Sequence, residues 1–180
     1  MDKLLGDPDK TAQFEALAMP HLDAAYNLAR WLTRNAHDAD DLVQNAYLRA
    51  FRFSDGFRGG DARTWLLTIV RHTYYTTQRN SRHQRADLGL DELPEEPQQD
   101  GVSDPAAITA ARDAGRSVDA ALSRLPYAFR EVLVLKEMDD LSYKEIAQVV
   151  DIPIGTVMSR LARARKLLLA YLKQGGQDGL

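Results

Sequence analysis

The chain has 180 residues, a formal net charge of −3 and no cysteine. A hydrophobic content of 44% is enough for a folded core, and the length suits one domain or two small ones. The lack of cysteine excludes disulfides, cysteine–zinc sites and thiol catalysis. Neither a long apolar run nor the apolar segment of a signal peptide occurs, so we expect a cytoplasmic protein without membrane insertion.

The negative charge is concentrated in the middle of the chain. Residues 1–86 contain 12 Lys and Arg against 10 Asp and Glu, a net charge of +2. Residues 87–116 contain 2 against 8, a net of −6, and residues 117–180 contain 9 against 8, a net of +1. The acidic segment also carries prolines and few apolar residues, which is typical of a flexible linker. Each flanking segment can therefore present a basic face although the total is acidic.

Three helices are predicted before this linker. Apolar residues recur at helical spacing over residues 12–34 and again over 38–53. A glycine-rich loop is expected at 54–63, followed by a long helix over 64–85. Opposite its apolar stripe, the 38–53 helix carries a mostly polar face, made of Asp41, Gln44, Asn45, Leu48 and Arg52. Taken alone, this pattern favours an ordinary solvent-exposed surface over a binding site.

The 64–85 helix is basic and partly aromatic. Its expected inner side consists of Trp65, Leu66, Ile69, Val70 and Thr73. The remaining sides contain no Asp or Glu and carry Arg71, His72, Tyr75, Arg79, Arg82 and Arg85. Arginine supplies phosphate contacts and aromatic rings supply stacking surfaces, so the helix and the loop before it suit an unpaired nucleic-acid strand. Core packing of Trp65, and of Phe57 in the loop, is an equally good alternative.

Residues 141–172 are predicted to form two helices joined by a tight turn. Ser142 and Glu145 form a capping box that begins the first helix, and Pro153 ends it. The second helix has an apolar stripe of Val157, Leu161, Ala164, Leu168 and Leu172. Its other sides carry Thr156, Ser159, Arg160, Arg163, Arg165 and Lys166. This pattern is typical of a helix-turn-helix, whose second helix enters the DNA major groove, and an ordinary helical hairpin is the alternative.

Two shorter apolar stripes precede this hairpin and are expected to cover it. One consists of Val118, Leu122 and Leu125, and the other of Phe129, Val132, Leu133 and Met138. The chain is therefore predicted to be all-α, with two small helical domains at 1–86 and 117–180 and a flexible acidic linker at 87–116.

Three segments of the chain together resemble the extracytoplasmic-function (group IV) RNA polymerase sigma factors of the sigma-70 family. Residues 38–44 resemble region 2.2 of that family, residues 57–71 resemble regions 2.3 and 2.4, and residues 125–165 resemble region 4. The resemblance covers residues 12–85 and 117–173. It implies a protein that binds core RNA polymerase and directs promoter-specific transcription initiation, and that an anti-sigma factor holds inactive.

The resemblance also implies roles for individual residues. The surface for the clamp helices of the polymerase β′ subunit would comprise Asp38, Asp41, Leu42, Gln44, Asn45 and Leu48. Capture and melting of the −10 element would fall to Phe57, Arg58, Arg63, Trp65, Arg71, His72, Tyr75 and Arg79. The −35 element would be read by Thr156, Ser159, Arg160, Arg163, Arg165 and Lys166, in a domain that also touches the polymerase β flap. No catalytic residue, metal or cofactor is implied.

Two residues depart from the family's pattern. Met158 stands where many relatives carry a basic residue, and it falls near the apolar side of its helix. We therefore expect it either to pack inward or to touch a thymine methyl. His72 stands where relatives often carry asparagine. Both departures concern the promoter sequence that is read.

Two other classes of protein are weaker alternatives. A helix-turn-helix regulator that is not a sigma factor, such as a response-regulator output domain, leaves residues 38–85 unexplained. An enzyme would have to use the four histidines, His21, His37, His72 and His83. These share no metal-ligand spacing, and no nucleophile motif accompanies them.

Overall fold

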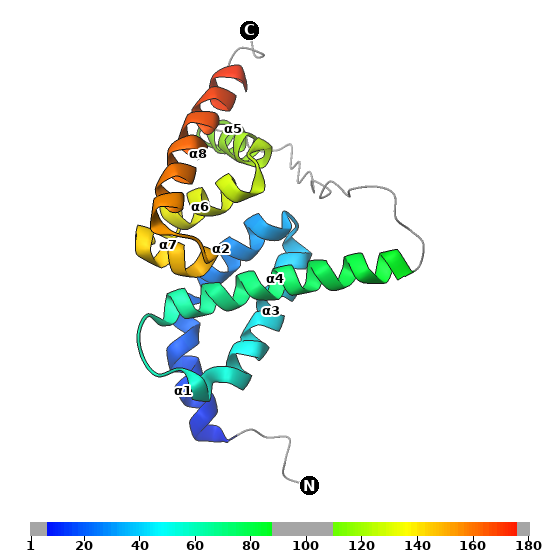
Figure 1. Ribbon diagram of the computed structural model, residues 1–180, viewed down its shortest axis with the longest axis vertical. Helices are drawn as coiled ribbons and strands as arrows, with labels where there is room; N and C mark the ends of the chain where they lie inside the picture. The colour runs from blue at the N-terminus through cyan, green and yellow to red at the C-terminus, as the bar shows by residue number, and fades with distance from the viewer. Residues whose placement is uncertain (1–6, 88–109, 176–180) are drawn as a thin grey trace. The chain divides into compact units, whose positions relative to one another are not determined.

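The computed structural model describes residues 7–87 and 110–175, which fold into α-helices and two short 3-10 helices (Figure 1). The chain divides into two compact units after residue 99. These residues contain no strand, so the predicted all-α class is confirmed. Within the same residues, no helix combines the length and the apolar character that crossing a membrane requires.

The first unit is built around three mutually packed helices. Its elements are α1 (Pro8–Ala18), η1 (Met19–His21), α2 (Leu22–Thr33), α3 (Ala36–Phe53), η2 (Ser54–Gly56) and α4 (Ala62–Asp87). Helices α2, α3 and α4 pack on one another, and α1 packs on α3 and α4. The core is filled by small and branched apolar side chains, among them Ala25, Leu28, Leu32, Val43, Ala46, Leu66, Leu67 and Val70.

The single helix predicted over residues 12–34 is wrong, because η1 separates α1 from α2. Pro20 lies in η1. Proline has no backbone N–H to donate and its ring crowds the carbonyl one turn earlier, so an α-helix does not continue through it.

The carbonyl of Ala18, at the end of α1, accepts a hydrogen bond from the Tyr47 hydroxyl at 2.9 Å. Burial, with the nearby negative charge of Asp23, raises the pKa of Tyr47 to about 12.

Over residues 110–175, the second unit has four helices, and the last of them contacts the other three. Its elements are α5 (Ala110–Arg124), α6 (Tyr127–Glu137), α7 (Tyr143–Val150) and α8 (Ile154–Gly175). The predicted linker, 87–116, lies outside the described residues except at its two helical ends, since α4 reaches Asp87 and α5 begins at Ala110.

Two residues assigned to the apolar stripes of this unit are exposed instead. Val118 is 39% exposed and lies in a part of α5, residues 115–120, where every residue is exposed. Met138 caps the C-terminus of α6 and is 51% exposed, although Asp139 and Leu141 just after it are buried. The deeper members of both stripes, Leu122, Leu125 and Val132, are buried as predicted.

Arg130 is a buried charge that joins α5 to α6. Its side chain is only 6% exposed. Its guanidinium donates hydrogen bonds to the carbonyl oxygens of Leu122 at 2.8 Å, Ser123 at 2.7 Å and Leu125 at 2.9 Å. Carbonyls in the last turn of a helix lack the usual donor four residues on, so Arg130 caps the end of α5 through Leu122 and Ser123 and also holds the Leu125 carbonyl just beyond it. The Leu122 carbonyl accepts from the Leu125 N–H as well, at 3.1 Å. Nothing in the sequence pattern marked this residue.

The capping box predicted at the start of α7 is confirmed. The Ser142 hydroxyl accepts from the Glu145 N–H at 3.1 Å, and the Glu145 carboxylate accepts from the Ser142 N–H at 2.6 Å. Asp151, in the left-handed conformation at φ 57°, ends the helix. Both ends of α7 are therefore defined by local geometry, and the turn to α8 begins at Asp151.

Replacing Ser142 by alanine should lower the free energy of opening of α7 and α8 by about 1 kcal/mol, because the N-cap acceptor is lost. Amide hydrogen exchange in the full-length chain measures this. Ser142→Thr keeps an acceptor and should lose less. Ser123→Ala is the matched control, since that hydroxyl only donates back to the Asp119 carbonyl within α5. Equal losses for both alanine variants would contradict the capping assignment.

Candidate nucleic-acid interface

Helix α8 presents one polar, basic face to solvent. At about 100° per residue, an arc of about 120° contains Thr156, Ser159, Arg160, Arg163 and Lys166. Ser159, Arg163 and Lys166 are exposed, and Thr156 and Arg160 are half-buried. The other side of the helix is fixed by the buried residues Val157, Leu161 and Ala164. Burial of the apolar stripe thus decides which residues meet a ligand.

The hydroxyl of Ser159 is already engaged as a donor. It donates to the Thr156 carbonyl one turn earlier, at 3.1 Å. The oxygen keeps its lone pairs and can still accept a hydrogen bond. In the DNA major groove, the amino groups of adenine and cytosine are the donors it could meet.

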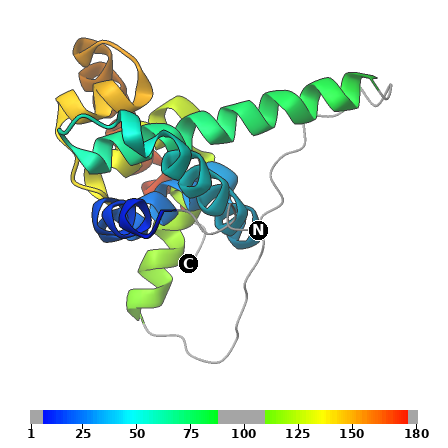
Figure 2. The ribbon, with the colours of Figure 1, turned by 90° about the horizontal axis from the view of Figure 1, so that it is seen from below.

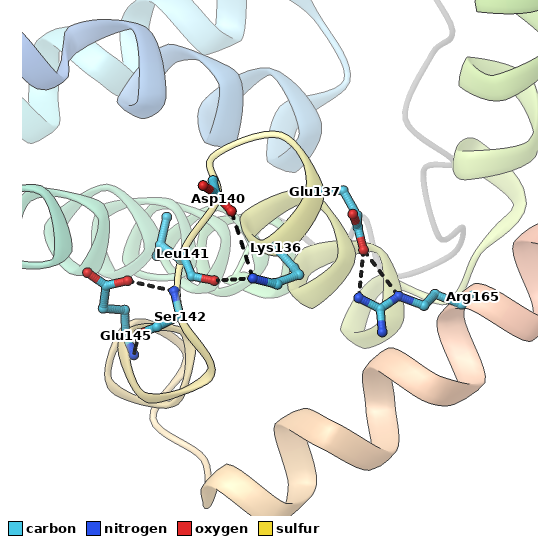
Figure 3. A network of polar contacts seen from close by, with 7 residues as sticks. All are labelled: Lys136, Glu137, Asp140, Leu141, Ser142, Glu145 and Arg165. Atoms are coloured by element: carbon cyan, nitrogen blue, oxygen red, sulfur yellow. Dashed lines mark hydrogen bonds and ion pairs between the residues drawn. The ribbon is translucent and has the colours of Figure 1, made fainter.

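Arg165 does not share this face. It lies about 160° around α8 from Arg163. Its Nε and Nη2 atoms donate to Glu137 Oε1 at the end of α6, at 3.1 and 2.7 Å (Figure 3). Hydrogen bonds to Glu137, and secondly to Tyr143, raise the pKa of Arg165. The structure therefore separates Arg165 from the five other residues predicted to bind the −35 element.

Of the two expectations for Met158, inward packing is wrong, and contact with a thymine methyl stays a prediction. It is 52% exposed, so it does not pack in the core. It also lies about 140° around α8 from Arg163, which takes it off the basic face. Met158 lies near the apolar side of α8, as its sequence position predicts, but neighbouring helices do not cover that flank.

The loop before α4 has a hydrogen bond at each end, the first from the Phe57 N–H to the Ser54 carbonyl at 3.0 Å. Gly59 and Gly60 adopt φ angles of 89° and 104°, which side-chain-bearing residues rarely adopt. The Asp61 carboxylate then accepts from the Arg63 N–H at 3.0 Å and the Thr64 hydroxyl at 2.6 Å. Helix α4 therefore begins at Ala62, two residues earlier than predicted, and Arg63 belongs to its first turn.

Phe57 and Trp65 pack on each other across this loop. Their ring centroids are 5.0 Å apart with the planes inclined by 42°, and both side chains are half-buried. Trp65 also packs against the core cluster of Ala18, Ala50 and Leu66. Core packing was the alternative left open for both rings. Both rings are in fact half-buried, so each packs inward with one part and is exposed with the other. The next residue, Arg58, is exposed.

The outer side of α4 carries a basic and aromatic stripe. The Arg71 guanidinium lies 4.6 Å from the Tyr75 ring centroid, and the Tyr74 ring meets Tyr75 edge-on at 5.4 Å. His72, Tyr75 and Arg79 are exposed, whereas the predicted inner residues Leu66, Val70 and Thr73 are buried. In Figure 2 the C-terminal part of α4 runs past the other helices of its unit. Within the stripe, His72, Tyr75 and Arg79 are therefore accessible, while Arg71 and Tyr74 are half-buried.

The outer face of α3 is mostly polar, with one exposed apolar residue, Leu48, in its C-terminal half. Asp38, Asp41, Gln44 and Asn45 are exposed, and Leu48 is 61% exposed. Asn35 positions the start of the helix by accepting from the Asp38 N–H at 3.0 Å. An isolated leucine among polar residues suits the centre of a protein-docking surface.

Leu42 does not belong to that face, contrary to the prediction from the resemblance. It is only 6% exposed and packs in the core, because it lies about 100° around the helix from Asp41. Leu42 can therefore affect a partner only indirectly, through the core packing that holds α3 in place.

The comparisons with known proteins agree with this division into two units. Residues 17–84 match Sigma-70 region 2, and residues 115–168 match Sigma-70, region 4. The helical fold, the helix-turn-helix and these two matches define a sigma-70-type protein. The chain is 34% identical over 139 residues to the ECF RNA polymerase sigma-E factor of Escherichia coli K12, covering 73% of this chain and 72% of that protein. The chain belongs to the ECF sigma factors of the sigma-70 family.

Another relative and two solved structures extend this similarity. The ECF RNA polymerase sigma factor SigE of Mycolicibacterium smegmatis is 33% identical over 175 residues, and the chain spans 66% of its length. RpoE of Bartonella quintana, solved with the anti-sigma factor NepR, gives a TM-score of 0.70 at 28% identity, over 89% of this chain and 97% of that one. CnrH, solved with the cytosolic domain of CnrY, gives 0.63 at 26% identity, over 94% and 91%.

Proposed function

We propose that this chain binds core RNA polymerase and directs promoter-specific initiation of transcription, without catalysing a reaction itself. The observation that carries the proposal is the presence of two separate basic helices, α4 and α8, one in each sigma-70-like unit. A helix-turn-helix regulator would need only the second unit. Since polymerase and chromosome share the bacterial cytoplasm, we propose that the chain acts there.

The two basic surfaces have different tasks in this proposal. On α8, Ser159 and Arg163 read base edges of the −35 element, while Arg160 and Lys166 hold phosphates. The loop at residues 57–61 and the outer side of α4 capture an unpaired base of the −10 element. Unpairing and flipping a base costs a few kcal/mol, which stacking on rings and contacts to arginine offset. The rings and cations of the stripe on α4 are the groups that this task requires.

Transcription with core polymerase from a library of promoter fragments with randomised upstream sequence tests the proposal. Sequencing the transcribed templates should reveal two short enriched blocks at a fixed spacing, one for each basic surface. Omitting the chain is the control. Binding to duplex DNA without any transcription would contradict the proposal and favour a regulator of another kind.

The outer face of α3 is proposed to dock on the clamp helices of the polymerase β′ subunit. Replacing Leu48 by glutamate should weaken core binding about tenfold, since it places a charge where an apolar side chain would be buried. Fluorescence titration of labelled chain with core enzyme measures this. Met19→Glu is the matched control, because Met19 is equally apolar and exposed in the same unit but lies off α3. Equal weakening by both variants would exclude α3 as the specific docking face.

A partner of the anti-sigma type is also proposed. RpoE and CnrH, the two solved relatives, are each held in a complex with another protein. In this chain, a protein that covered the outer face of α3 would block the proposed core contact. The chain is therefore expected to lose its binding to core RNA polymerase when such a partner is added.

A further inference from the structure

Three helices of the second unit meet at a polar corner, formed by Lys136, Glu137, Tyr143 and Arg165. Glu137 at the end of α6 receives both hydrogen bonds from Arg165 of α8, as Figure 3 shows. Both side chains are about half exposed. Lys136 donates to the Leu141 carbonyl at 3.2 Å and lies 5.6 Å from the ring centroid of Tyr143, the first residue of α7. The corner thus ties α6, α7 and α8 together.

This corner differs physically from the apolar packing beneath it. Val157, Leu161 and Ala164 bury the inner side of α8, but apolar contact is non-directional and permits small rotations of a helix. An arginine that donates through two nitrogens to a carboxylate has a defined direction. Because Arg165 lies about 160° around α8 from Arg163, a rotation that breaks the pair also moves the basic face.

We propose that Glu137 is a positioning residue for promoter reading: by holding Arg165, it sets the rotation of α8 at which Ser159 and Arg163 meet base edges. Arg165 then supports the reading helix and holds no phosphate. The proposal rests on the proposed function of α8 as the reader of the −35 element. If Arg165 instead held a DNA phosphate, it would have to leave Glu137, and the two roles predict different results for a charge swap.

The test uses full-length variants assembled with core polymerase. Two templates are compared, namely a promoter selected by the wild type from the randomised library and the same promoter with its −35 block scrambled. The ratio of their transcript yields measures discrimination. Glu137→Arg and Arg165→Glu each place like charges together, and each should lower the ratio about fivefold, the upper range for a part-exposed ion pair. The double variant E137R/R165E restores an opposite pair and should return the ratio to within about twofold of wild type.

Asp119→Arg is the matched control, because it makes the same charge change on an exposed site of α5. It should raise yield on both templates and leave the ratio unchanged. Amide hydrogen exchange verifies that α8 stays folded in every variant. Should Glu137→Arg unfold the unit, the neutral Glu137→Gln variant should lower the ratio in the same direction by a smaller factor.

Two results would overturn the proposal. A double variant as impaired as Arg165→Glu would show that Arg165 contacts DNA directly. A folded Glu137→Arg variant with the wild-type ratio would show that the pair does not position α8. A wild-type holoenzyme that transcribes no selected promoter contradicts the proposed function instead, and that outcome is distinct from either result of the swap.

Discussion

Replacing Arg130 by methionine is expected to destabilise the second unit by about 3 kcal/mol, because the carbonyls of Leu122, Ser123 and Leu125 lose the buried guanidinium. Of the three, the Leu122 carbonyl still accepts from the Leu125 N–H at 3.1 Å. Methionine fills similar apolar space but donates no hydrogen bond. Domains of this size are stable by only about 5–15 kcal/mol, so such a loss is a large fraction of the total. The first unit should keep its stability, since Arg130 bonds within the second.

Amide hydrogen exchange in the full-length chain separates the two units. Protection should fall throughout α5, α6 and α8 and stay unchanged in α2 and α3. Arg130→Lys should lose nearly as much, because one ammonium on a flexible stem does not reproduce the planar guanidinium. Arg124→Met is the matched control, since Arg124 is exposed, lies 4.2 Å from the Tyr171 ring centroid and donates to Gln174. A comparable loss in Arg124→Met would show that no special cap exists at Arg130.

Replacing Arg163 by alanine should weaken selection at the −35 element specifically, while leaving general DNA affinity nearly intact. A good bidentate contact between an arginine and a base is worth about 1–3 kcal/mol of discrimination, or roughly 5- to 150-fold. Arg163 is exposed at the centre of the basic face of α8, so it is the arginine placed for such a contact. Transcription from the selected and scrambled −35 templates measures the change.

Lys166→Ala is the companion variant and should behave differently. A lysine that holds a phosphate contributes to every sequence alike, so both templates should weaken evenly. The slope of log affinity against log salt should fall by about 0.9 for the one lost phosphate contact. If both variants reduced yield equally on both templates, Arg163 and Lys166 would share one role and the assignment of base reading would be wrong.

Helical periodicity was sufficient to predict most of the architecture. The apolar stripes of α3, α4 and α8 coincide with their buried sides, and the capping box at Ser142 appears where its spacing placed it. The pattern failed at Pro20, where apolar spacing continued through a proline that ended α1. Periodicity records which side of a helix is apolar, and the backbone chemistry of proline overrides it.

The side-chain partners could not be predicted from spacing. Arg130 and Arg165 both appear in the sequence as cations in amphipathic helices, yet one caps α5 from a buried position and the other pairs with Glu137. Met138 was assigned to an apolar stripe and Met158 was placed near one, yet both are half exposed. Each outcome depends on which helix covers a given flank, and this is set by contacts between residues far apart in the chain.

The hydroxyl of Ser159 limits how this factor could be retargeted to a new promoter. In this geometry its hydrogen is donated to the Thr156 carbonyl, so Ser159 accepts from a base without rotating the hydroxyl. A serine in this state accommodates adenine or cytosine and gains nothing from the acceptor-only edge of guanine. An engineered factor intended to recognise guanine at that base pair is therefore expected to gain most from arginine or lysine at position 159, whose side chains supply hydrogen-bond donors.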